Sequence, residues 1–204
     1  LKCFSEADGL IYIDRQVLDQ AQDWITSHQN QDGSFDAVGF VHHQEMVGGV
    51  SGKTALTAYV TIALLQAGER NAVDRAVAYL EKQLDDTDDP YTVALMAYAL
   101  ALAESDEAEP AVEKLMELAK EDENGLYWGG DEVVPLEQTG PEPGLFRMPI
   151  KPEPSTSSIE ATAYATLALL KQGDKISASR AAKWLVSKRN ASGGFGSTQD
   201  TVLS

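Results

Sequence analysis

Hydrophobic positions along the chain follow two alternating kinds of helical pattern. One kind is apolar on almost every side, with many Ala, Leu and Thr residues, which predicts a helix buried all round. The other kind is apolar only at i, i+3, i+4 and i+7, which is typical of a helix with one buried face. The first kind covers 57–67, 97–103 and 162–172, and the second covers 17–25, 73–84, 112–119 and 181–188. Buried helices are therefore expected to alternate with amphipathic ones.

Two internal repeats support this alternation. Segment 57–68 recurs as 162–173 with eight of twelve positions identical, and each copy ends in a glycine, a common helix stop. In addition, a Trp, an Asn, a Gly and a Phe fall at the same spacing in 24–35 and 184–195. Each copy of this second repeat predicts an outer helix, a glycine turn and an aromatic side chain that packs back before the next inner helix.

The fold that satisfies these patterns is an all-α α/α toroid, with an inner ring of buried helices wrapped by an outer ring. No strand-like alternation of useful length is present. We expect a single domain over residues 1–204. Six prolines between 135 and 154 predict an irregular surface loop at about 121–158, with Tyr127 and Trp128 anchoring it to the helices.

The chain is strongly acidic, with 16 Lys and Arg against 32 Asp and Glu and a formal charge of −16. This balance excludes nucleic acid and anionic membranes as expected partners, because phosphate binding needs clustered cations. No apolar run is long enough to insert into a bilayer. A solvated acidic surface explains the charge, and a basic protein partner stays open.

Part of the acidic charge lies in one run. Asp89 followed by Pro90 is typical of a helix start, with the aspartate as N-cap and the proline at the first helical position. The alternative is a docking face for a basic partner, formed by Asp85, Asp86, Asp88 and Asp89.

Candidate chemistry is concentrated in 40–49, a polar stretch that ends in two glycines. It holds His42 and His43, with Glu45 two residues further on. Neutral imidazole is a competent nucleophile or base near pH 7. This spacing alone matches no metal site or catalytic triad, so a solvated loop is the plainer interpretation. Asn190 begins a glycosylation sequon, a common triplet and a weak hint of secretion.

Several stretches together resemble the thioester-containing domain of the α2-macroglobulin/complement C3 superfamily. The resemblance covers essentially the whole chain and is carried by Gln31-Asp32-Gly33-Ser34-Phe35, Val41-His42-His43-Gln44-Glu45-Met46-Val47-Gly48-Gly49, Tyr91-Thr92 with Ala97-Tyr98-Ala99, and Gly193-Gly194-Phe195-Gly196-Ser197-Thr198-Gln199-Asp200-Thr201. It implies an α/α toroid within a secreted or surface-attached protein of many domains.

In that superfamily an internal thioester joins the Cys and Gln of Gly-Cys-Gly-Glu-Gln, near the start of the domain. That motif is absent here, and the single Cys3 is followed by Phe-Ser-Glu, so it does not match the thioester cysteine. A lone cysteine also gives no internal disulfide or metal cluster. The resemblance leads us to expect a fragment that starts after the reactive centre and stops before the toroid closes.

His43 matches the histidine of complement C3-like members in Val-x-His-Gln-Glu-Met-x-Gly-Gly. There the imidazole attacks the thioester and forms an acyl-imidazole, which favours hydroxyl over amine acceptors. For this chain the resemblance implies the same role for His43, with Glu45 as possible support through its effect on an imidazole pKa. His42 has no counterpart in the motif and is expected to be a bystander.

The resemblance implies covalent tagging of target proteases or surfaces, at their hydroxyls and amines, after proteolytic activation of a secreted parent. This is self-consuming acyl transfer rather than turnover by an enzyme, and it needs no metal or cofactor. The alternative is a non-covalent module that a receptor or regulator recognises through the acidic face. A terpenoid-handling toroid is a third possibility by fold analogy alone, and the sequence offers no Asp-rich catalytic motif or metal-ligand set for it.

Overall fold

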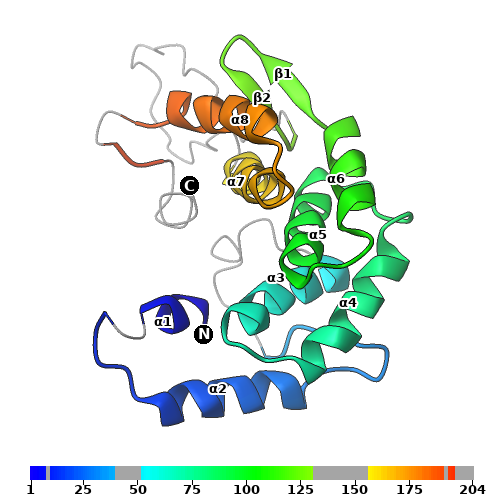
Figure 1. Ribbon diagram of the computed structural model, residues 1–204, viewed down its shortest axis with the longest axis vertical. Coiled ribbons are helices and arrows are strands. Elements are labelled where there is room, and N and C mark those ends of the chain that lie inside the picture. Colours follow the sequence, from blue (N-terminus) through cyan, green and yellow to red (C-terminus); the bar gives the residue numbers. More distant parts are fainter. Residues whose placement is uncertain (8–9, 40–51, 131–155, 191–192, 196–204) are drawn as a thin grey trace, which may run out of the picture.

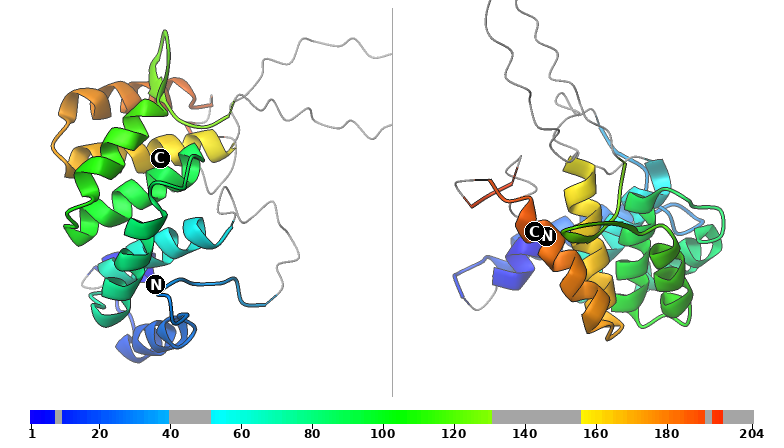
Figure 2. Two further views of the ribbon diagram at one scale, coloured as in Figure 1. Left: turned by 90° about the vertical axis from the view of Figure 1, so that its right-hand side faces the viewer. Right: turned by 90° about the horizontal axis from the view of Figure 1, so that it is seen from above.

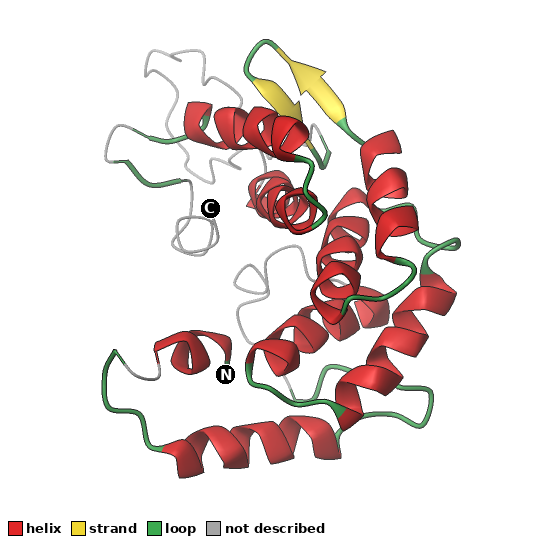
Figure 3. Cartoon of the chain, in the orientation of Figure 1, coloured by secondary structure: helices red, strands yellow, loops and turns green. Residues whose placement is uncertain are grey.

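The computed structural model describes residues 1–7, 10–39, 52–130, 156–190 and 193–195. The described residues are mainly helical, and their two strands form a short β-hairpin (Figure 3). In chain order the elements are α1 (Lys2–Ala7), α2 (Arg15–Ser27), α3 (Gly52–Gln66), α4 (Asn71–Gln83), α5 (Pro90–Ala103), α6 (Ala108–Glu117), β1 (Lys120–Asp122), β2 (Gly125–Tyr127), α7 (Thr156–Lys171) and α8 (Lys175–Ser187).

The helices form two layers that follow an arc (Figure 1). In the inner layer α1 contacts α3, α3 contacts α5, and α5 contacts α7. In the outer layer α4, α6 and α8 each pack against the inner helix that precedes them. Helix α5 is therefore shielded from solvent by its neighbours, and the two layers confirm the all-α prediction of inner and outer helices.

Inner helices α5 and α7 run parallel, as contacts along their length show. The rings of Tyr98 and Tyr164, each near the middle of its helix, have centroids 6.2 Å apart. At the carboxyl ends, the Lys171 ammonium lies 3.9 Å from the Glu104 carboxylate. The amino ends of α5 and α7 therefore lie on the same side of the helical layers, and the turns that leave the two helices lie on the other side.

Helix α5 forms the centre of the core. Every residue from Tyr91 to Ala101 is buried. The alanines at 97, 99 and 101 are each at most 3% exposed. Small side chains let inner helices on both sides approach closely. The apolar character on every side, visible in the sequence, is thus explained by neighbours on every side.

Helix ends follow the glycines that the repeat predicts. Gly68 and Gly173 have φ of 81° and 86°, in the left-handed region that glycine adopts without strain. In each case the next N–H returns to the helix: Glu69 donates to the Leu64 carbonyl and Asp174 to the Leu169 carbonyl, both at 3.0 Å. These are the bonds of a Schellman motif, so the predicted helix stops are confirmed.

Two glycine turns bind successive outer helices together. Gly33, after α2, passes directly against the Arg75 carbonyl of α4, and Gly125, after α6, against the Arg180 carbonyl of α8. A Cβ at either glycine would overlap that carbonyl oxygen, and φ is +90° at Gly33 and +144° at Gly125. Both positions therefore require glycine for close approach as well as for backbone conformation.

After each glycine turn, an aromatic residue bonds to the next inner helix. The Phe35 N–H donates to Thr57 Oγ1 of α3 at 3.0 Å, and the Trp128 N–H donates to Thr162 Oγ1 of α7 at 3.1 Å. Thr57 and Thr162 are equivalent positions of the first sequence repeat. The repeated threonines thus each accept the backbone N–H of an aromatic residue that follows a glycine turn.

The irregular loop expected at about 121–158 needs a correction at both of its ends. Its start, 121–127, belongs to the β1–β2 hairpin, which lies against α8 (Figure 2), and its last three residues belong to α7. The expected anchor is confirmed, because Trp128 is fully buried and Tyr127 stacks on Trp184 with ring centroids 4.9 Å apart. Residues 131–155 lie outside the described residues.

Helix α2 departs from the expected pattern of burial. It has the predicted amphipathic stripe, yet none of its residues is buried, and Val17 and Trp24 are 54% and 55% exposed. Only Ile25, near its end, packs against the small cluster around Phe35. The sequence therefore predicted the helix correctly and its burial wrongly.

Candidate functional site

The predicted reactive stretch, 40–49 with His42, His43 and Glu45, lies outside the described residues. Helix α3 begins at Gly52, shortly after it. The structure describes the framework of inner helices α3, α5 and α7 that follows in the chain.

A buried carboxylate lies within that framework. Glu160 of α7 is fully buried, and the Tyr91 hydroxyl of α5 donates to its Oε2 at 3.0 Å. Tyr164, one turn further along α7, is 2% exposed. A carboxylate removed from water is tolerated only when donors replace its hydration. The Tyr91–Glu160 bond meets part of that need and links two inner helices near their amino ends.

Burial and neighbouring charge shift the titration of both phenols. Burial, followed by the Glu160 charge and the hydrogen bond to it, raises the pKa of Tyr91 far above its usual value near 10. Burial, then Tyr59 and Glu160, raises the pKa of Tyr164 as well. Because both hydroxyls keep their protons through the physiological range, Tyr91 remains a hydrogen-bond donor there.

This shift predicts a loss of stability in alkali. Proton binding by Tyr91 favours the folded state, because its folded pKa lies above its unfolded pKa. The stabilisation is complete below about pH 10 and declines as the pH rises further. Tyr91→Phe should lower the free energy of unfolding by about 1–3 kcal/mol at neutral pH and weaken the alkaline decline. Urea denaturation across this range measures both effects.

Tyr12→Phe is the matched control, since Tyr12 is 91% exposed. It should leave both the stability and its pH dependence unchanged. An alkaline decline of the same steepness in Tyr91→Phe and in the unmodified chain would contradict the assignment.

Sequence reasoning did not single out Glu160, although a signal was present. It lies two residues before 162–172, the stretch expected to be buried on all sides, and it is the lone charged residue between Ile159 and Leu170. A carboxylate in such a position must find a partner inside the protein. Tyr91 of α5, whose helix contains a looser copy of the same repeat, is that partner.

The cap predicted in the acidic run is confirmed. The Asp89 carboxylate accepts the Thr92 N–H at 2.9 Å and the Thr92 hydroxyl at 2.6 Å, and Pro90 is the first residue of α5. This satisfies backbone donors that a helix start leaves open.

A lysine from α6 binds much of the rest of the run. The Lys114 ammonium donates to the Leu84 and Asp85 carbonyls at 2.7 and 2.9 Å and lies 3.3 Å from the Asp88 carboxylate. The run thus closes the connection between α4 and α5. The docking role of Asp85, Asp86, Asp88 and Asp89 stays a prediction.

The sequon asparagine forms a turn. Asn190 Nδ2 donates to the Phe195 carbonyl at 3.0 Å, and its Oδ1 accepts the Gly194 N–H at 3.1 Å. The Asn190 N–H donates to the Gly194 carbonyl, as the Asn30 N–H does to Ser34 in the earlier repeat. The repeated asparagines are therefore explained by turn geometry, and glycosylation at Asn190 stays a prediction.

A pair of substitutions separates the two roles of Asn190. If the turn is its main role, Asn190→Gln should lower the free energy of unfolding by about 1 kcal/mol, because the longer side chain misplaces both bonds. Ser192→Ala destroys the sequon, leaves the asparagine in place and should be neutral. Denaturation of both variants, with intact mass from a secreting host, measures stability and glycan together. Equal stability of the two variants would contradict the turn role.

Two further properties of the described residues bear on function. None of the helices in them is long and apolar enough to cross a membrane. Within the same residues, His, Cys, Asp and Glu side chains form no group of three or more that could hold a metal ion.

Comparison with known proteins identifies the fold family. The model of the A-macroglobulin TED domain matches residues 1–204. The chain belongs to this family. Ovostatin of Gallus gallus is 35% identical over 99% of the chain, and complement C3 of Lethenteron camtschaticum is 36% identical over 100%. The chain spans 14% and 12% of the lengths of these two relatives.

Membership of the family confirms the resemblance inferred from the motifs and agrees with the two helical layers. The family match also runs through residues 40–51, so His43 lies inside the matched domain. The identities to ovostatin and to complement C3 are nearly equal, and overall similarity therefore does not choose between them.

Proposed function

We propose that this domain serves covalent attachment by acyl transfer within a larger extracellular protein. Proteolytic activation of the parent exposes a thioester formed by a Cys and a Gln outside this chain. The target is a protease or a surface that offers hydroxyl or amine groups. The observation that carries the proposal is the family match over 1–204, with His43 inside it.

His43 acts as the acyl carrier in this proposal. An imidazole nitrogen attacks the thioester carbonyl, the C–S bond breaks, and the cysteine leaves as a thiolate. A target hydroxyl then attacks the acyl-imidazole and the C–N bond breaks, which gives an ester. The thiolate takes the hydroxyl proton, so no proton is left unassigned. Glu45 can orient the imidazole through its charge.

This chemistry consumes the protein, because each thioester reacts once. It therefore fits an inhibitor or a surface tag rather than an enzyme that turns over. The thioester itself supplies the activated acyl group, so the proposed reaction needs no metal or cofactor.

The test is to activate the intact parent with a protease in the presence of that protease or of a polysaccharide surface. We expect conjugates that survive boiling in detergent and that hydroxylamine releases, because hydroxylamine cleaves esters and leaves amides. Conjugates absent after complete proteolytic activation would contradict covalent attachment. Conjugates that resist hydroxylamine would contradict the hydroxyl preference and with it the role of His43.

A further inference from the structure

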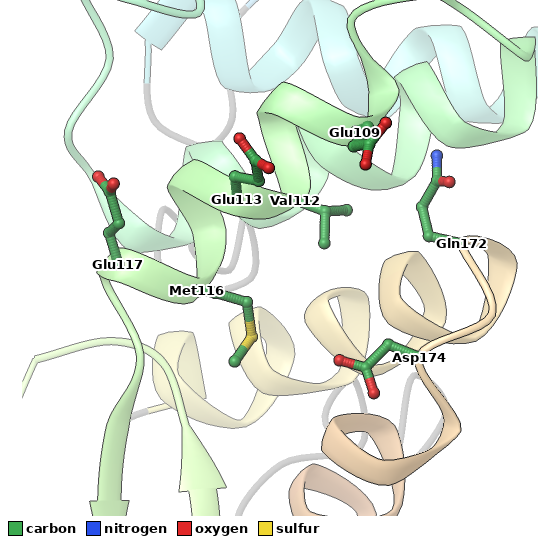
Figure 4. A pocket seen from close by; sticks show the side chains of 7 residues that line it. All are labelled: Glu109, Val112, Glu113, Met116, Glu117, Gln172 and Asp174. Carbon is green, nitrogen blue, oxygen red and sulfur yellow. The ribbon is translucent and has the colours of Figure 1, made fainter.

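A groove lies between α6 and the turn that joins α7 to α8, with a volume of about 760 Å³. Its floor includes Val112 and Met116, which are half-buried and come from one face of α6. In Figure 4 both side chains extend from α6 toward the α7–α8 side, and Asp174 extends from that side into the same space. A thioether is adaptable and occurs often at surfaces that receive varied partners.

Carboxylates surround this floor. Glu109, Glu113 and Glu117 follow one another at i, i+4 and i+8 along α6, and Asp174, the N-cap of α8, lines the groove from the other side. Hydrogen bonds from the Ser177 hydroxyl and N–H lower the pKa of Asp174, so it is charged at neutral pH. The other lining residue is Gln172, and no cation lines the groove in the described part of the chain.

Three nearby cations are engaged elsewhere. Lys114 of α6 binds the α4–α5 connection, Lys171 pairs with Glu104, and Arg180 of α8 pairs with Glu121. The acidic edge is therefore not neutralised by these side chains.

This arrangement of carboxylates destabilises α6 when the groove is empty. Like charges at i, i+4 on a helix destabilise it. Glu117 is also the last residue of α6, where the helix dipole disfavours negative charge. An apolar floor with an edge of mutually repelling carboxylates is complementary to a cationic occupant that also carries apolar side chains.

We propose that this groove binds a basic amphipathic helix of a second protein, with Lys or Arg at i, i+4 spacing beside apolar residues. Its apolar side chains lie over Val112 and Met116, and its cations pair with the glutamate row, as in other helix-in-groove complexes. The surface is separate from the run Asp85–Asp89 and does not depend on acyl transfer.

The test uses the intact protein and a synthetic helical peptide of about 15 residues, built from Leu, Lys and Ala with lysines at i, i+4. The protein variant is the triple replacement Glu109→Gln, Glu113→Gln and Glu117→Gln. Its matched control is Asp19→Asn, Asp23→Asn and Asp106→Asn, exposed positions outside the groove and outside the run Asp85–Asp89, with the same change in charge. A scrambled peptide of the same composition reports attraction by net charge alone.

At physiological salt we expect the groove variant to weaken peptide binding at least about ten-fold and the control variant less than about two-fold. The groove variant should also melt at a higher temperature than the unmodified protein, since it removes repulsion within α6. Equal losses in both variants would overturn the proposal, as would equal binding of the scrambled peptide or no peptide binding at all.

Discussion

Replacing His43 with asparagine in the intact parent should reverse its choice of acceptor. We expect transfer to glycerol to fall roughly 100-fold, the usual scale for losing a catalytic imidazole. Transfer to methylamine should persist, because an amine is nucleophilic enough to attack a thioester directly. The variant would then release its thiol in the presence of amine and hardly at all in the presence of glycerol.

The adjacent histidine provides the control for this prediction. His42→Asn removes an imidazole one residue away and should leave the ratio of glycerol to methylamine incorporation close to that of the unmodified protein. Labelled glycerol and methylamine, counted on the purified protein after activation, give the ratio for each variant. An unchanged ratio in His43→Asn would refute the assignment, and a shift in His42→Asn alone would move it to the other histidine.

Replacing Gly33 with alanine should strongly destabilise the outer layer. The left-handed backbone at φ +90° costs a non-glycine residue about 1–2 kcal/mol. The new Cβ would also overlap the Arg75 carbonyl, and α4 would have to move away. Gln29 Nε2 bridges the Gly33 and Ala72 carbonyls at the same contact. We expect the free energy of unfolding to fall by more than about 3 kcal/mol.

Gly68→Ala is the control, since Gly68 has φ +81° and no atom within 4 Å of a Cβ at that position. It should cost only the backbone strain, about 1–2 kcal/mol. Urea denaturation of the 204-residue chain compares the two variants. A Gly33→Ala variant as stable as Gly68→Ala would show that the contact between α2 and α4 contributes little.

The layered helices were predictable because a helix buried on all sides is apolar at nearly every position of its sequence. An element such as α5, enclosed on every side, must be apolar on every side, and small residues must allow close approach. The caps were predictable for a local reason: Asp89 with Pro90, and the glycines at 68 and 173, act on their own backbone.

The hairpin was missed because its stability is not local. Lys120-Glu121-Asp122 is three polar residues with no alternation to detect. The hairpin is held by contacts distant in sequence: the Trp184 indole N–H donates to the Asp122 carboxylate at 3.1 Å, and Lys188 lies 4.8 Å from the centroid of that ring. Single-sequence periodicity contains no information on such pairs.

For α2 the sequence predicted a buried face that the structure does not show. Its stripe of apolar residues implies a buried face, but periodicity says nothing about which element covers it. In the described structure Trp24 is 55% exposed, and its ring lies against that of His28, four residues further on, with ring centroids 4.4 Å apart. The functional stretch is a different case, because the motif around His43 predicts its role and residues 40–51 lie outside the described residues.

The most direct test of the central claim is made on the intact parent, by labelling with methylamine and with glycerol and then mapping this domain by mass spectrometry. The account predicts covalent uptake, release of about one thiol per protein, and a preference for glycerol that depends on His43. No uptake of either reagent, with no thiol released, would contradict acyl transfer. The toroid would then serve binding or structure alone.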